Sequence, residues 1–325
     1  PFRISMASNI RPGSKFFGKN VFIAILLLIT IIFLPVFISF YTVTQSQKSF
    51  STVSLVSHLK VAEGENITKT FAAYGYNLAK IKRGEADVPN LFLEQLPREL
   101  TTLNNNKTKK DLFISSLLPP ILKVNEYIRY ERKRLLKIIK SIEINGDASL
   151  DELFWLRRKM LRYRMEEFNI DELHSRMNII PVSLALTQSA IETGWGTSRF
   201  AQDGNALFGQ WTWNDASGIV PLGREVGATH SIKRFNDLIS AVEGYSLNLN
   251  THSAYQDFRT ERAKFSRNKI IVVDKDLLFT LLYYSELGFA YIDSLTNIIG
   301  ANNLRSFDNV KLQKTAYQKL KLSPI

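Results

Sequence analysis

The feature that most constrains this chain is a long uncharged apolar run near its N-terminus, from Val21 to Val43. No charged residue occurs between Lys19 and Lys48. A helix needs about 20 apolar residues to cross the hydrocarbon core of a bilayer, and one soluble domain rarely covers so long an uncharged stretch. We therefore expect a transmembrane helix over residues 21–43 and a folded region after it.

The charges before this run predict its orientation. Four basic residues precede it without an acid: Arg3, Arg11, Lys15 and Lys19. The positive-inside rule then places residues 1–20 in the cytoplasm and the chain after residue 45 outside. A cleavable signal peptide is the alternative, but the run is longer than a usual signal h-region and no small-residue cleavage site follows it. We expect a retained, single-pass signal anchor in the inner membrane and a periplasmic folded region.

Composition narrows the chemistry of that region. The 325-residue chain has no cysteine, which excludes disulfides, iron–sulfur clusters and thiol catalysis. Its formal net charge is +12, with a local excess in "RYERKRLLKIIK", residues 129–140. Outside the membrane, an anionic wall polymer or lipid surface suits this charge better than nucleic acid. The segment also lacks interleaved RNA-binding aromatics, so we interpret it mainly as a solvated helical face.

The apolar pattern divides the outer region into segments. Residues 44–110 indicate a helical juxtamembrane and linker segment, interrupted by Pro89 and Pro97. A mainly helical domain is predicted over residues 111–305, with a C-terminal tail over residues 306–325.

Three helices are predicted early in that domain. In the first, apolar residues recur every three or four positions, and Pro119 and Pro120 should kink or split it. The segment "NGDASLDEL" indicates a turn and then a helix start, with Ser149 or Asp151 as the cap. The third begins near Pro181, whose fixed φ suits a first helical turn.

Glu192 ends an apolar helical stripe directly before a Gly-Trp-Gly turn, in "LALTQSAIETGWGTSRF". A carboxylic acid in a partly desolvated cleft stays protonated near neutral pH and can donate a proton to a glycosidic oxygen. A glutamate beside a turn is, however, more often a solvated surface residue. Spacing alone leaves both interpretations open.

Aromatic and amide side chains, the types that hold sugars, lie close to Glu192 in the sequence. The Gly- and Asn-rich stretch after the turn has short alternating pieces at Ile219–Leu222 and Ala228–Phe235, which predict a small β-hairpin lobe. Tryptophans in one loop region are usually core residues, which is the alternative here. The predicted substrate-binding residues are Gln188, Trp195, Asn205, Phe208, Gln210 and Trp211.

The stretch "ALTQSAIETGWGTSRFAQDGNALFG" resembles the signature of the glucosaminidase family of peptidoglycan hydrolases, A-x-x-Q-x-A-x-E-[ST]-G-W-G followed by N-x-L-F-G. The segments "LPRELTTLNNNKTKKDLFISSLLPPILKVNEYI", "LHSRMNIIPVSLALTQ" and "YSLNLNTHSAYQDFR" resemble its Bax branch. The resemblance covers about Val88 to Ile299. It implies a lysozyme-like α+β domain, mainly helical with a small β lobe. It also implies cleavage of the β-1,4 bond after N-acetylglucosamine in peptidoglycan.

The resemblance carries over to particular residues. Glu192 matches the family's general acid. The second carboxylate lies in the β lobe of the family, where Glu225 is the best match and Asp215 a weaker one. Many members carry Tyr-Ala-Thr-Asp and then a second tyrosine; in the shortened "LGFAYIDSLTNII", Phe289 stands near the first tyrosine and Tyr291 matches the second. A catalytic role for Tyr291 is thus implied, with an aromatic packed on the last helix as the alternative.

Other site chemistries lack their motifs. The four histidines show no metal-ligand spacing, and neither a phosphate-binding glycine loop nor a serine elbow occurs. The sequence therefore predicts a membrane-anchored peptidoglycan hydrolase, an endo-β-N-acetylglucosaminidase, that needs no cofactor or metal and binds no nucleic acid. A lytic transglycosylase and a non-catalytic glycan-binding membrane protein are the alternatives.

Overall fold

Helices form most of the chain that can be described. The computed structural model describes residues 58–59, 66–213, 218–221, 224, 230–266 and 273–314. The predicted cytoplasmic segment, residues 1–20, and the predicted transmembrane helix, Val21–Val43, lie outside these residues. Within the described ranges, no helix combines the length and the apolar character that a membrane crossing requires.

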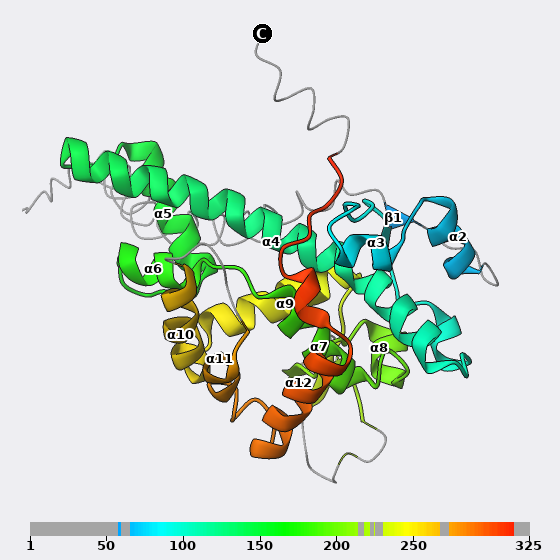
Figure 1. The fold of residues 1–325 in the computed structure, drawn as a ribbon. Helices are drawn as coiled ribbons and strands as arrows, with labels where there is room; N and C mark the ends of the chain where they lie inside the picture. The colour runs from blue at the N-terminus through cyan, green and yellow to red at the C-terminus, as the bar shows by residue number, and fades with distance from the viewer. Residues whose placement is uncertain are drawn as a thin grey trace, which may run out of the picture. The chain divides into compact units, whose positions relative to one another are not determined.

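The expectation of a mainly helical domain with a small sheet is confirmed (Figure 1). The α-helices are α2 (Ile67–Ala73), α3 (Leu78–Lys82), α4 (Asn106–Asn145), α5 (Leu150–Arg162), α6 (Ile170–Arg176), α7 (Val182–Thr193), α8 (Arg199–Gly204), α9 (Leu238–Thr251), α10 (Gln256–Ser266), α11 (Lys275–Phe279) and α12 (Phe289–Ala301). Short 3-10 helices are η2 (Arg98–Thr101), η4 (Ser253–Tyr255) and η5 (Leu304–Phe307). The strands are β1 (His58–Leu59), β2 (Phe92–Leu93), β3 (Trp211–Thr212), β4 (Gly218–Ile219) and β5 (Ser231–Lys233).

The longest element, α4, runs for 40 residues without a break. Of the two predicted effects of Pro119 and Pro120, a kink or a split, the split was therefore wrong. A proline inside a helix costs about 3 kcal/mol, because it removes one backbone hydrogen bond and crowds the preceding turn. Here every side chain from Leu112 to Leu122 is buried. Burial of large apolar side chains contributes roughly 1.5 kcal/mol or more each, and this segment contains enough of them to outweigh both prolines.

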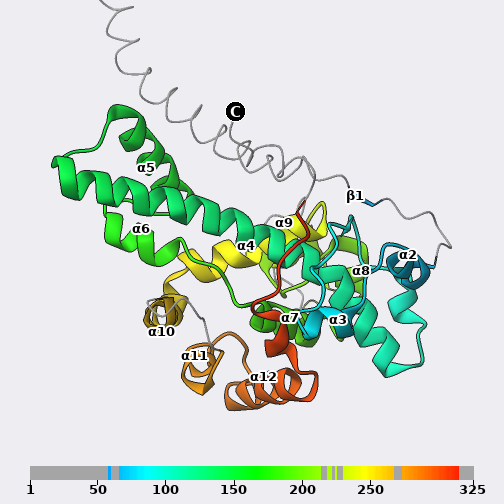
Figure 2. The ribbon, with the colours of Figure 1, turned by 45° about the horizontal axis from the view of Figure 1, so that its top comes forward.

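Different helices cover the two halves of α4. Its buried N-terminal half packs against α7, and α9 also packs along it. Its C-terminal half shares an apolar cluster with α5 and α6, to which Leu135, Trp155 and Leu173 contribute. In Figures 1 and 2, α5 and α6 accordingly lie beside one end of α4, and α7 and α8 lie toward the other.

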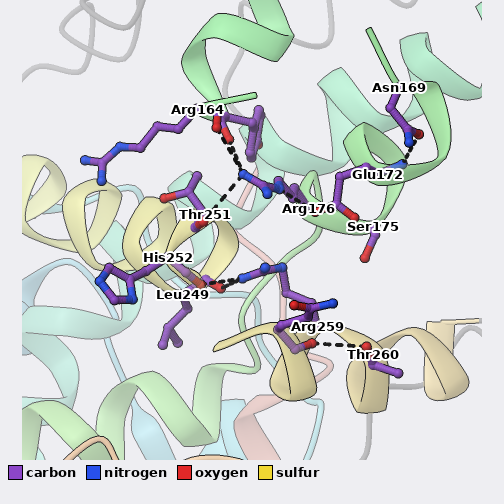
Figure 3. Close-up of polar contacts among 12 residues, drawn as sticks. Arg164, Asn169, Glu172, Ser175, Arg176, Leu249, Thr251, His252, Arg259 and Thr260 are labelled. Carbon is purple, nitrogen blue, oxygen red and sulfur yellow. Dashed lines mark hydrogen bonds and ion pairs between the residues drawn. The ribbon is translucent and has the colours of Figure 1, made fainter. Parts of the chain in front are cut away.

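Arginine side chains of α6 and α10 bind backbone carbonyls at the C-terminal ends of α5 and α9 (Figure 3). Arg176 Nη1 donates to the carbonyls of Tyr163 at 2.9 Å and Thr251 at 3.5 Å, and Arg259 Nη1 donates to that of His252 at 2.8 Å. Cations are stabilised at helix C-termini, where carbonyls lack intrahelical partners. These contacts fix the end of α9 against α6 and α10.

Arg262 is fully buried and holds the loop that leads into α7. Its guanidinium donates to the carbonyls of Ile179 at 3.1 Å and Ser175 at 3.2 Å. Burial lowers the pKa of Arg262 to about 9, which still leaves the side chain mostly charged at neutral pH. The start of α7 is therefore attached to α10.

The predicted hairpin lobe is a small antiparallel sheet in which β5 lies between β3 and β4. Ile232 of β5 pairs with Trp211 on one side and with Ile219 on the other. The Lys233 amide also donates to the Gln210 carbonyl at 2.8 Å. The sheet thus fixes the backbone directly after Gly209.

The segments on either side of the helical core also pack together. Val88 and Leu312 form a parallel bridge, with the Val88 amide donating to Lys311 O and the Gln313 amide donating to Val88 O, both at 2.8 Å. Lys82 Nζ donates to the carbonyl of Asn302 at 3.0 Å. Described parts of the predicted linker and of the predicted tail therefore contact each other.

Candidate functional site

Helix α7 carries Glu192 in its last turn and is buried for most of its length. Pro181 stands at the N-cap position and provides no side-chain cap. Asp308 provides one instead, since its carboxylate accepts from the amide and from the hydroxyl of Ser183, both at 2.8 Å. Burial raises the pKa of Asp308 to about 6, although the bonds from Ser183 lower it. At the other end Gly194 adopts the left-handed conformation that ends the helix.

The Glu192 carboxyl is half-buried against Gly209 and Tyr291. A Cβ on Gly209 would lie 2.8 Å from Glu192 Oε2, and φ at Gly209 is +62°, so the position suits only glycine. The Tyr291 hydroxyl donates to Glu192 Oε1 at 3.4 Å. Burial raises the pKa of Glu192, whereas the bond from Tyr291 lowers it. Net burial favours the protonated carboxyl, which is the form a general acid requires.

A chain of hydrogen bonds leads from the interior to Glu192. The Tyr245 hydroxyl donates to Gln188 Oε1 at 2.6 Å, and Gln188 Nε2 donates to the Tyr291 hydroxyl at 3.0 Å. Tyr291 then donates to Glu192. Gln188, Tyr245 and Tyr291 are buried. Each group in this series has one geometry that satisfies its neighbours, so the hydrogen bonds together fix the direction of the Tyr291 hydroxyl.

Stacked aromatic rings support this chain. Phe208 stacks on Tyr245 with ring centroids 3.9 Å apart, and Tyr284 stacks on Tyr291 at 5.6 Å. The Tyr284 hydroxyl also donates a hydrogen bond to the Phe208 carbonyl at 3.0 Å. The ring centroids of Tyr255 and Tyr284 are 5.9 Å apart. Sequence reasoning missed Tyr245, Tyr255 and Tyr284. The signal was present, since "YSLNLNTHSAYQDFR" begins at Tyr245 and contains Tyr255.

Two predicted substrate-binding residues have partners in the interior. Asn205 Nδ2 donates to the carbonyls of Phe235 at 3.2 Å and Glu94 at 3.3 Å, and Phe208 lies in the stack described above. Both side chains are buried, as is Gln188. They support the site from behind, and a direct contact with glycan stays a prediction for all three.

The other three predicted binding residues are more accessible. Trp195 is half-buried, with its ring edge-on to Phe113 at 5.6 Å. Gln210 Nε2 donates to the Gly244 carbonyl at 3.2 Å. Trp211 is 53% exposed and stacks on His230 with ring centroids 4.6 Å apart. An exposed aromatic ring of this kind provides an apolar face for a sugar.

The structure brings Glu192, Gln188 and Tyr291 together from α7 and α12, while their predicted roles stay predictions. Phe289, near the first tyrosine of the family pattern, is exposed and packs edge-on to Phe279 at 6.3 Å. Glu225 and Asp215 lie outside the described residues, so the second carboxylate stays a prediction. Across the described residues, no group of three or more histidine, aspartate or glutamate side chains is arranged to hold a metal ion.

Glu243 on α9 is a second acid with a strongly shifted pKa. Burial raises the pKa of Glu243 to about 8, against the opposing effect of Arg162. Its charged neighbours are Arg162, the last residue of α5, and Asp237, the N-cap of α9. Glu243 takes no part in the hydrogen bonds that join Tyr245, Gln188, Tyr291 and Glu192, so Glu243→Gln is a suitable control for Glu192→Gln.

The hydrogen bond from Tyr291 to Glu192 predicts a pH effect. A general acid acts while protonated, so activity is lost as the pH rises through the pKa of Glu192. Tyr291→Phe removes a bond that lowers this pKa, so the alkaline limb of the pH–activity profile should move to higher pH. Turnover of peptidoglycan across a pH series measures the shift, and the exposed Phe289→Leu is the matched control that should not move it. A limb that moves to lower pH would contradict the assignment.

Comparisons with known proteins find a family domain in this part of the chain. Residues 169–304 match the model of the glucosaminidase family, described as mannosyl-glycoprotein endo-beta-N-acetylglucosaminidase. This range contains Glu192, Tyr291 and the β lobe, and the chain belongs to this family.

Within the family, the chain is a Bax-like member. It is 30% identical over 189 residues to Protein bax of Escherichia coli (strain K12), a match that covers 56% of this chain and 66% of that relative. The matched part is thus slightly less than two thirds of the relative's length. No solved structure gives a significant match.

Proposed function

We propose that this chain is an endo-β-N-acetylglucosaminidase that hydrolyses peptidoglycan glycan strands with Glu192 as general acid. The observation that carries the proposal is the Glu192 carboxyl, half-buried beside Gly209 and bonded to Tyr291, with its pKa raised by burial. Such a carboxyl keeps its proton near neutral pH and can transfer it to the leaving glycosidic oxygen. The stacked tyrosines hold the acid, and exposed Trp211 offers a sugar-binding face.

The step after proton transfer decides between hydrolysis and its rival. Cleavage produces oxocarbenium character, which a hydrolase resolves with water oriented by a second carboxylate, here Glu225 by resemblance. A lytic transglycosylase uses one acid and closes an anhydro ring without water. This rival is kept because Glu225 lies outside the described residues.

Product analysis tests the proposal. Purified sacculi are digested with the full chain, reduced with borohydride and analysed by mass spectrometry. Hydrolysis should give reducible N-acetylglucosamine ends, whereas a transglycosylase gives ends that resist reduction and are lighter by one water. Absence of new ends, with glycan still bound, would instead indicate the non-catalytic glycan-binding protein.

We further propose that Val21–Val43 anchors the protein in the inner membrane with the hydrolase on the periplasmic side. The supporting observation is the uncharged run with only basic residues before it. A reporter fused after Ile325 should be active only in the periplasm, and the protein should stay with the membrane through a salt wash. A shorter soluble form that begins near Gln45 would show a cleaved signal instead.

A further inference from the structure

The outer face of the C-terminal half of α4 carries a stripe that glycan cleavage does not use. Its basic members are Lys133, Lys137 and Lys140, and its apolar members are Tyr130, Leu136 and Ile144. Tyr130, the three lysines and Ile144 recur at alternating steps of three and four residues, which aligns them along one side of a helix. All six side chains are exposed. At a rise of 1.5 Å per residue the stripe is about 21 Å long.

The opposite side of the same helix half is already covered. Leu135 and Ile138 are buried in the cluster formed with Trp155 and Met160 of α5. The stripe therefore takes no part in the packing of α4 against α5. Its exposed apolar side chains distinguish it from an ordinary solvated face, which is polar. Leu136 is 47% exposed, Tyr130 68% and Ile144 70%, beside lysines that make no ion pair within the described part of the chain.

The composition of the stripe indicates the chemistry of its partner. Protein–protein interfaces are depleted of lysine, which argues against a protein partner. A hydrated wall polymer would pair with the lysines but leave the apolar side chains in water. An anionic lipid surface satisfies both kinds of residue, because lysine and tyrosine place polar ends among headgroups while apolar groups enter the interface. Each basic residue near such a surface adds about fivefold to binding.

We propose that the stripe docks on the anionic lipid surface of a membrane and so fixes how the folded region lies against it. This inference goes beyond glycan cleavage and does not depend on it, because no residue of the Glu192 site belongs to the stripe. The inference rests on the proposed membrane anchor for one point, which is proximity to the membrane. Residue 66, where α2 is capped, lies only 23 residues after residue 43, so it stays within roughly 75 Å of a membrane crossed by Val21–Val43.

The absence of native cysteine allows a direct test on the full chain. Ile144→Cys carries an environment-sensitive fluorophore, and the protein is reconstituted with its folded region outside vesicles that contain nitroxide-labelled lipid. Phosphatidylglycerol vesicles should quench the label, and pure phosphatidylcholine vesicles should not. Leu287→Cys, a site of similar exposure at 65%, is the matched label control and should stay unquenched in both.

Charge variants complete the test. Changing Lys133, Lys137 and Lys140 to Gln together should shift the docked-to-undocked ratio by roughly 100-fold and abolish most quenching. The control variant changes three exposed lysines outside α4 to Gln, and its label should still be quenched; these lysines are Lys69, Lys80 and Lys311. Hydrolysis of soluble glycan fragments should be unchanged in the first variant, which also verifies its folding. Equal quenching in neutral vesicles, or protection of the Ile144 label by sacculi alone, would overturn the proposal.

Discussion

Glu192→Gln is expected to lower turnover of purified peptidoglycan by about 100-fold or more, because a general acid contributes on that scale. The amide keeps the shape of the carboxyl and can still accept from Tyr291, so the space beside Gly209 remains filled and stability should change little. Release of reducible glycan ends measures the first effect and thermal unfolding the second.

Glu243→Gln is the matched control for this experiment. Glu243 is also a half-buried acid with a raised pKa, but its charged neighbours are Arg162 and Asp237, and it is not bonded to the stacked tyrosines around Glu192. Its substitution should leave turnover within a few-fold of the unmodified protein. If Glu192→Gln were as active as Glu243→Gln, Glu192 would have no place in the mechanism.

The second large effect is expected from Gln188→Leu. Leucine fills similar volume but removes the acceptor of the Tyr245 hydroxyl at 2.6 Å and the donor to the Tyr291 hydroxyl at 3.0 Å. Tyr291 keeps its bond to Glu192. An unpartnered buried hydroxyl costs about 1–3 kcal/mol and a lost hydrogen bond about 1 kcal/mol, so the free energy of unfolding should fall by about 2–4 kcal/mol. Denaturant unfolding measures the loss, and turnover should fall too because Tyr291 is no longer oriented.

Two readouts separate this positioning role from substrate contact. Tyr245→Phe removes only the first hydroxyl of the chain and should cost less, about 1–2 kcal/mol. Substitution of a residue whose only role is to contact glycan would raise KM and leave the free energy of unfolding unchanged. That result for Gln188→Leu would refute the buried chain of hydrogen bonds and support the predicted contact with substrate.

Features set by neighbouring residues were predictable from the sequence. Ser149 caps α5 through a capping box with Glu152, as the local pattern indicates. The end of α7 at Thr193, directly after Glu192, follows from the Gly-Trp-Gly turn, since Gly194 takes the left-handed conformation there. The small sheet follows from short alternating segments between glycines. In each case the interactions that decide the structure lie within a few residues.

Features that depend on distant partners were not predictable. Pro119 and Pro120 remain inside one helix because α4 is surrounded there, which no local pattern shows. The approach of Tyr284 to Phe208 and Tyr291 depends on how α12 folds back on α7. The second carboxylate and the membrane anchor remain predictions, since Glu225 and Val21–Val43 lie outside the described residues.

The cap on α7 has a consequence for the order in which the protein is made. Ser183 obtains its partner from Asp308, which is 125 residues later in the chain. A protein leaves the ribosome N-terminus first, so the helix that bears Glu192 emerges long before the carboxylate that completes its first turn. The Val88–Leu312 bridge closes equally late. A chain interrupted during synthesis between residues 291 and 308 therefore contains both Glu192 and Tyr291 yet lacks the carboxylate that caps α7.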